Sequence, residues 1–186
     1  MCAWLLVFLA DNKLVNTSPW TSDLSGLPLS NRRAYGRIVS SPFQFRDATL
    51  KRLHSLQTKD SSGHIIGEKP LYALTLTSTN GSSATVYFTR ETGLLMERFE
   101  VRHRPNEKST KRSVPTGITS IQFIAPDPKT EEMTPHVYHE RFSTRLNFGG
   151  FRDGRATGSI VMVFPDSKRS FVSGAFKARL VGFAQP

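Results

Sequence analysis

The residues best suited to metal chemistry gather at His136, His139 and Glu140. Imidazole and carboxylate groups are good ligands for zinc or iron. The helical zinc-protease motif needs both histidines on one helix face with the glutamate beside the first, and this spacing does not supply that. On a strand, residues three apart point to opposite faces. We therefore expect a polar strand edge here and predict no metal site. His136, His139 and Glu140 remain weak candidates for metal ligands. We expect no cofactor.

The sequence contains no other arrangement typical of catalysis. It has no Gly-x-Ser-x-Gly nucleophile elbow, no P-loop and no Gly-x-Gly-x-x-Gly fingerprint. Glu97 and Glu100 could pair as acid and base, but the neighbouring Arg98 and Arg102 favour a solvated strand face. We therefore predict that the protein is not an enzyme. A hydrolase or metal enzyme built around His136, His139 and Glu140 is the catalytic alternative.

Basic residues form the more substantial group. The chain carries 25 Lys and Arg against 15 Asp and Glu, a formal net charge of +10. Such a charge predicts attraction to nucleic acid, anionic lipid, acidic glycans or an acidic protein surface. Arginine favours bidentate capture of carboxylate or phosphate. Between positions 98 and 112 we expect five residues to bind a partner, namely Arg98, Arg102, Arg104, Lys111 and Arg112.

A second basic group consists of Arg141, Arg145, Arg152 and Arg155. Three interpretations of the basic groups stay open: a solvated sheet face, docking on an acidic protein, or binding of nucleic acid. Single-stranded nucleic acid would need exposed aromatic side chains between the charges. The aromatic residues instead occupy alternating positions typical of a core, so we expect nucleic acid to be the lesser partner.

Period-two alternation in the last quarter of the chain predicts the elements that carry these residues. Apolar side chains alternate in three runs, and a turn-like Pro165 to Arg169 segment separates the last two. Such alternation is typical of a sheet with one buried face. The runs are Phe142, Leu146 and Phe148, then Ile160, Met162 and Phe164, then Val172, Phe176, Ala178 and Leu180.

The clearest hairpin runs from Leu71 to Thr89, with Asn80 and Gly81 expected to supply the positive φ angles of a tight turn. Along the whole chain we expect about eight to ten strands and no helix longer than two turns. The fold class is therefore all-β, as a single antiparallel β-sandwich or jelly-roll-like domain over residues 34–182.

Residues 1–33 are expected to form an extended arm with an apolar tip. The run from Cys2 to Ala10 is far shorter than the ~20 residues that a membrane-spanning helix needs. It is either a signal segment whose basic start is missing or a docking segment that contacts a partner. In the second case the apolar contacts would come from Trp4, Leu5, Phe8 and Trp20.

The C-terminal motifs resemble a pattern in uncharacterised planctomycete-type secreted proteins. The residues that carry the resemblance are the Gly158–Ile160 strand, the Pro165–Asp166 turn and the Val172 to Ala178 strand. The early Gly36–Ile38 and Phe43 to Leu50 stretches are similar to the start of such domains. In that group these motifs close a β-sandwich. The resemblance covers residues 34–180 and implies export from the cytoplasm, but it implies no activity and no functional residue.

These observations lead to two functional hypotheses. The first is a non-catalytic accessory or structural subunit of a larger assembly, periplasmic or secreted and near a membrane, which docks on acidic protein subunits through the arm and the Arg-rich surface. The second is a secreted binding module for an acidic glycan or another polyanion. The chain has a single cysteine, Cys2, which excludes an internal disulfide. A single cysteine is compatible with a cytosolic protein as well as with a periplasmic one.

Overall fold

The structure is a computed structural model of the 186-residue chain, and it describes residues 31–59, 61–90, 99–103, 117–127, 129–139 and 142–183. For residues 99–103 it describes the backbone. These ranges form strands, turns and bends and contain no helix, so the predicted all-β class is confirmed.

Ten strands form one sheet in the order β5-β8-β9-β10-β1-β2-β3-β4-β6-β7. Neighbouring strands in this order run antiparallel. Their bounds are β1 Tyr35–Ile38, β2 Ser41–Lys59, β3 Ile65–Ser78, β4 Ser83–Thr89, β5 Phe99–His103, β6 Gly117–Pro126, β7 Met133–Tyr138, β8 Ser143–Arg152, β9 Arg155–Val163 and β10 Phe171–Val181.

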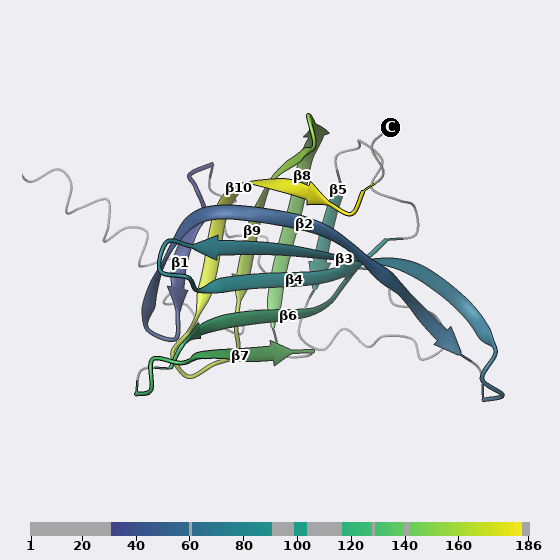
Figure 1. The fold of residues 1–186 in the computed structure, drawn as a ribbon, viewed down its shortest axis with the longest axis horizontal. Coiled ribbons are helices and arrows are strands. Elements are labelled where there is room, and N and C mark those ends of the chain that lie inside the picture. Colours follow the sequence, from purple (N-terminus) through teal and green to yellow (C-terminus); the bar gives the residue numbers. More distant parts are fainter. Residues whose placement is uncertain are drawn as a thin grey trace, which may run out of the picture.

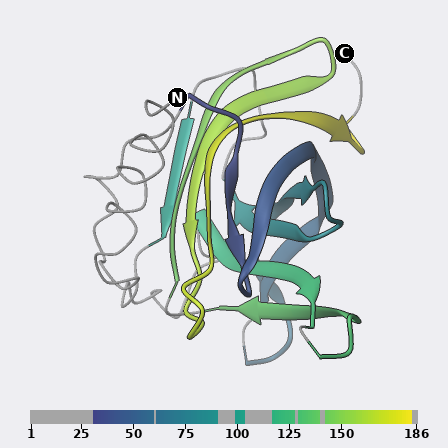
Figure 2. The ribbon, with the colours of Figure 1, turned by 90° about the vertical axis from the view of Figure 1, so that its left-hand side faces the viewer.

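The sheet folds over on itself to make two layers (Figures 1 and 2). One layer holds β5, β8, β9, β10 and β1, and the other holds β2, β3, β4, β6 and β7, whose strands cross the first set steeply. The short β1 separates β10 from β2 at one end. Beyond it β10 pairs directly with β2 in parallel, from Ala178 opposite Ala48 to Val181 opposite Lys51. This corner joins the layers, so the predicted sandwich is one continuous sheet.

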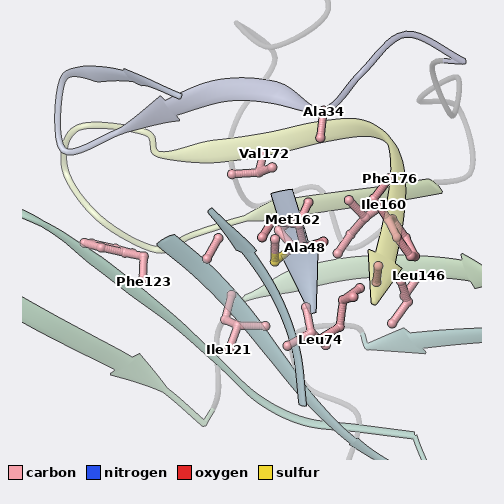
Figure 3. Packing of buried hydrophobic residues seen from close by; sticks show 14 of the residues in the cluster. Ala34, Ala48, Leu74, Ile121, Phe123, Leu146, Ile160, Met162, Val172 and Phe176 are labelled. Atoms are coloured by element: carbon pink, nitrogen blue, oxygen red, sulfur yellow. The ribbon is translucent and has the colours of Figure 1, made fainter. Parts of the chain in front are cut away.

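The core lies between the layers and follows the predicted alternation. Leu146, Ile160, Met162 and Phe176 project from one layer toward Leu74 and Ile121 of the other (Figure 3). The alternating residues of the last three strands are buried, except Leu180, which is half-buried. Aromatic rings fill much of the volume, as in the edge-to-face pair of Phe123 and Phe164 with centroids 5.0 Å apart. Such pairs contribute beyond simple burial.

The predicted Leu71 to Thr89 hairpin is present, but its turn differs in detail. Gly81 has a φ of 85°, whereas Asn80 is not among the positive-φ residues. The Asn80 side chain instead accepts a hydrogen bond from the Ser82 amide at 3.0 Å and donates one to the Pro42 carbonyl at 3.2 Å. The connection is therefore a longer loop whose asparagine acts through its side chain, as is common in turns.

A two-stranded ribbon extends from the body where β2 and β3 continue past their neighbours (Figure 1). The pairing of β3 with β4 begins at Leu71, and that of β2 with β10 ends at Lys51. Beyond these points, the described parts of β2 and β3 pair with each other alone, from Ser55 opposite Pro70 to Lys59 opposite Ile65. We call residues 53–59 and 65–70 the ribbon.

Candidate anion-binding site

Many of the predicted partner contacts lie outside the described residues. This holds for the arm residues Trp4, Leu5, Phe8 and Trp20, and for the basic residues Arg98, Arg104, Lys111 and Arg112. Among the described residues, Arg33 is the first to enter the sheet pairing. It bridges Ala175 of β10, and the Ala175 amide donates to the Arg32 carbonyl at 2.6 Å. The division of the chain into an arm and a sandwich domain stays a prediction.

Strand β5 brings the two predicted basic groups together. Arg102 lies directly opposite Arg145 in the antiparallel pairing of β5 with β8. Basic residues more than forty positions apart in the sequence therefore meet on neighbouring strands, which the sequence alone does not reveal.

The histidine cluster is spread along the rim of the second layer. His136 lies in β7 opposite Phe123, and the two rings are 4.6 Å apart at their centroids. His139 follows the end of β7, and Glu140 lies outside the described residues. Among the described residues, no group of three or more His, Cys, Asp or Glu side chains could hold a metal ion.

Tyr138, the last residue of β7, has a raised pKa. Burial raises the pKa of its phenol, and the charge of Asp166 raises it further. The ring packs against Phe123 and Phe164, with centroid distances of 5.9 and 6.1 Å. Asp166 is held in place because one carboxylate oxygen accepts a hydrogen bond from the Ser170 amide at 3.0 Å. This arrangement stabilises a neutral phenol and supplies no ionised nucleophile.

A row of three exposed arginines crosses three neighbouring strands. Arg152 of β8 lies opposite Arg155 of β9, and Arg155 lies opposite Arg179 of β10. All three are exposed. Their neighbours Ala156 and Ala178 are buried, so the arginines project from the face turned away from the core. We call Arg152, Arg155 and Arg179 the arginine row.

The backbone beneath the arginine row is firmly fixed. Asp153 and Gly154 form the β8–β9 turn with φ angles of 52° and 67°, as expected of a tight hairpin turn. The Gly154 carbonyl accepts a hydrogen bond from the Leu180 amide at 2.9 Å. That bond ties the turn to β10, next to Arg179. The row therefore sits on three connected strands rather than on a loose loop.

The arginine row places like charges side by side. Residues directly opposite on neighbouring strands have Cβ atoms about 4.5–5.5 Å apart, and like charges there destabilise the sheet. Arg152 and Asp153 form an ion pair at 3.5 Å, but both side chains are more than four-fifths exposed, so it offsets little. An anion bridging the guanidinium groups would relieve the repulsion and gain charge-assisted hydrogen bonds.

Sequence reasoning identified two members of the row and missed the third. Arg152 and Arg155 belong to the predicted second basic group, whereas Arg179 lies 24 positions beyond Arg155. A signal for it was present. Lys177 and Arg179 alternate with Phe176 and Ala178, which predicts that both point outward. Pairing the last strand against the one before it would then have placed Arg179 beside Arg155.

Comparison with protein-family models, with curated proteins and with solved structures found no match. The described residues contain no helix that is long and apolar enough to cross a membrane.

Proposed function

We propose that the protein is a non-catalytic accessory or structural subunit of a larger assembly, which docks on an acidic surface of a protein partner. The observation that carries this proposal is the arginine row. Three exposed arginines on paired strands form a positive surface, and arginine is enriched at protein interfaces. In this proposal the protein acts in the periplasm or outside the cell, near a membrane.

Apolar surface beside the row favours a protein over a glycan. Val181 follows Arg179 by two positions on β10, so both point to the same side, and Val181 is 36% exposed. Lys51 lies opposite Val181 on β2 and is exposed as well. Protein interfaces have an apolar core and are enriched in arginine, so the exposed Val181 beside the arginine row favours a protein partner.

The test is purification of the tagged full-length protein from its native cells, in mild detergent at low salt. The wild type is compared with Arg155→Glu, which reverses the central charge of the row. We expect a stoichiometric protein partner whose affinity falls at least about tenfold (~1.4 kcal/mol) in the variant. High salt should weaken the wild-type complex because exposed charges are screened.

Lys168→Glu is the matched control. It changes the net charge by the same amount, and Lys168 is exposed in the β9–β10 turn, at the opposite end of β9 from Arg155. Equal retention of the partner by Arg155→Glu and the wild type would contradict docking through the row. Elution without any protein partner, combined with row-dependent capture on an immobilised acidic glycan, would establish the glycan-binding module instead.

A second experiment addresses the predicted arm. Deleting residues 1–30, which include Trp4, Leu5, Phe8 and Trp20, should leave a folded domain that no longer assembles. The described core draws its residues from Ala34 onward. An unfolded product, judged by circular dichroism, would show that the segment belongs to the core and would remove it from the docking surface.

A further inference from the structure

The ribbon ends in the two most exposed large hydrophobic residues of the described chain. Ile65 is 53% exposed and Ile66 is 57% exposed. Both belong to β3, whose other end is buried. Neither residue adds to the core, so the packing of the body does not account for them.

A β-bulge lies at this pair of isoleucines. Lys59 is opposite Ile65 and Thr58 is opposite Gly67, so Ile66 is the extra residue on its strand. Bulges bend the strand and re-aim side chains, and they occur where pairing ends or near functional sites. The bulge therefore concentrates two bulky apolar side chains close to the end of the ribbon.

The chemistry of the ribbon changes along its length. Five residues separate the two strands in the sequence: Asp60, then the small, uncharged and exposed Ser61, Ser62 and Gly63, then the exposed His64. The isoleucines follow immediately. The exposed Lys59 lies beside Ile65, and the exposed Arg52 lies further along β2 toward the body.

We propose that the ribbon tip inserts into the surface of an anionic membrane. Interfacial elements bury a modest apolar surface at the boundary of headgroups and acyl chains, while nearby cations meet the anionic headgroups. The long stem of Lys59 lets its ammonium group stay at headgroup level while Ile65 is inserted. The net charge of +10 adds attraction to the same surface.

The narrowness of the ribbon favours a membrane over a protein groove. Its outer edges have no strand partner among the described residues, so the isoleucines stand at the end of two strands rather than on a broad face. A standard protein interface buries about 800 Å² on each partner, which a two-residue tip does not provide. Shallow insertion into lipid needs no such area. This inference uses a site separate from the arginine row and does not depend on the proposed function.

The test is flotation of the purified full-length protein with phosphatidylcholine vesicles, with and without phosphatidylserine. We expect binding to the phosphatidylserine vesicles, and a decrease of at least about tenfold in the Ile65→Ser/Ile66→Ser variant, because two inserted side chains are lost. The control is Met133→Ser/Val137→Ser, since these β7 residues are 46% and 49% exposed and lie away from the ribbon. The control should bind as the wild type does.

Two further variants sharpen the result. Glu68 is the acidic residue among the described ribbon positions, and it is exposed, so Glu68→Gln should strengthen binding about twofold to fivefold. A dye on Ile66→Cys, in a Cys2→Ser background, should shift its emission to the blue when vesicles are added. This readout does not depend on the folding of the serine variant.

Three results would overturn the inference. The first is wild-type protein that does not bind phosphatidylserine vesicles. The second is equal binding by the ribbon variant and the wild type. The third is an equal loss in the β7 control, which would indicate unspecific apolar contact. If the ribbon variant instead lost a co-purified protein, the tip would be a protein-docking element. The arginine row is intact in every variant, so none of these results decides the proposed function.

Discussion

The two ends of strand β3 share one backbone and have opposite environments. At the body end, Tyr72, Leu74 and Leu76 are at most 1% exposed and lie between β2 and β4. At the ribbon end, Ile65 and Ile66 are more than half exposed. The alternation of the body end is explained by folding alone. The ribbon end exposes apolar groups that folding does not need, so its residues are better explained by an interaction.

Leu74→Ala should have the largest effect on stability and tests the body end of the comparison. Leu74 is fully buried between Leu50 of β2 and Val86 of β4. Truncation removes buried methyl groups and leaves a cavity, so the free energy of unfolding should fall by about 2–5 kcal/mol. Urea denaturation measures this. A loss below about 0.5 kcal/mol would show that the body end is not part of the core.

Gly158→Ala and Gly63→Asn compare a glycine of the body with one at the ribbon turn. A Cβ at Gly158 would collide with the Asn147 carbonyl and lie 2.6 Å from the Phe176 ring. We expect Gly158→Ala to cost about 1–3 kcal/mol of stability. Nothing lies within 4 Å of a Cβ at Gly63, and its φ of 84° is one that asparagine tolerates. Gly63→Asn should therefore change the thermal unfolding midpoint little. Equal losses of stability in the two variants would contradict the difference between the body and the ribbon turn.

Tyr138→Phe probes the rim of the body through pH. The folded state raises the pKa of Tyr138 above its ordinary value of 10.0, through burial and then Asp166. The unfolded chain therefore releases this proton first. Stability should be full below pH 10 and fall as pH rises through the folded pKa, since the native state holds the extra proton. In the Tyr138→Phe variant, the free energy of unfolding should therefore fall less steeply with pH above pH 10. Urea denaturation at a series of pH values measures this slope. An unchanged slope would show that the phenol is not buried.

Ile66→Ala should have the smallest effect and tests the ribbon end directly. Its side chain is 57% exposed and lies outside the hydrophobic core. Exposed substitutions away from special features stay within about 0.5 kcal/mol. The denaturation midpoint should therefore match that of the wild type. A loss comparable to that of Leu74→Ala would mean that the ribbon packs as core.

Local pattern predicted much of the fold. Alternation identified the three C-terminal strands, and the turn-like Pro165 to Arg169 segment marked the turn between the last two, because period-two burial and turn chemistry are properties of nearby residues. The Asn80 and Gly81 loop was located correctly, although its geometry was not. These strands and turns could be predicted because each depends on residues that are close together in the sequence.

Properties set by distant residues escaped prediction. The sequence patterns did not predict a strand as long as β2, which has 19 residues. No local signal shows that β2 and β3 continue past their neighbours, because that depends on where β4 and β10 stop. Arg179 joined the arginine row for the same reason. Register between strands far apart in the sequence decides which side chains meet.

The most direct test of the account is to shorten the ribbon and measure stability and vesicle binding on the same protein. Replacing residues 56–69 by Asn-Gly would close a tight hairpin between Ser55 and Pro70, which are paired in the native sheet. We predict a denaturation midpoint close to that of the wild type together with loss of binding to phosphatidylserine vesicles. A protein that unfolds, or one that still binds the vesicles as the wild type does, would contradict the assignment of the ribbon to interaction rather than to folding.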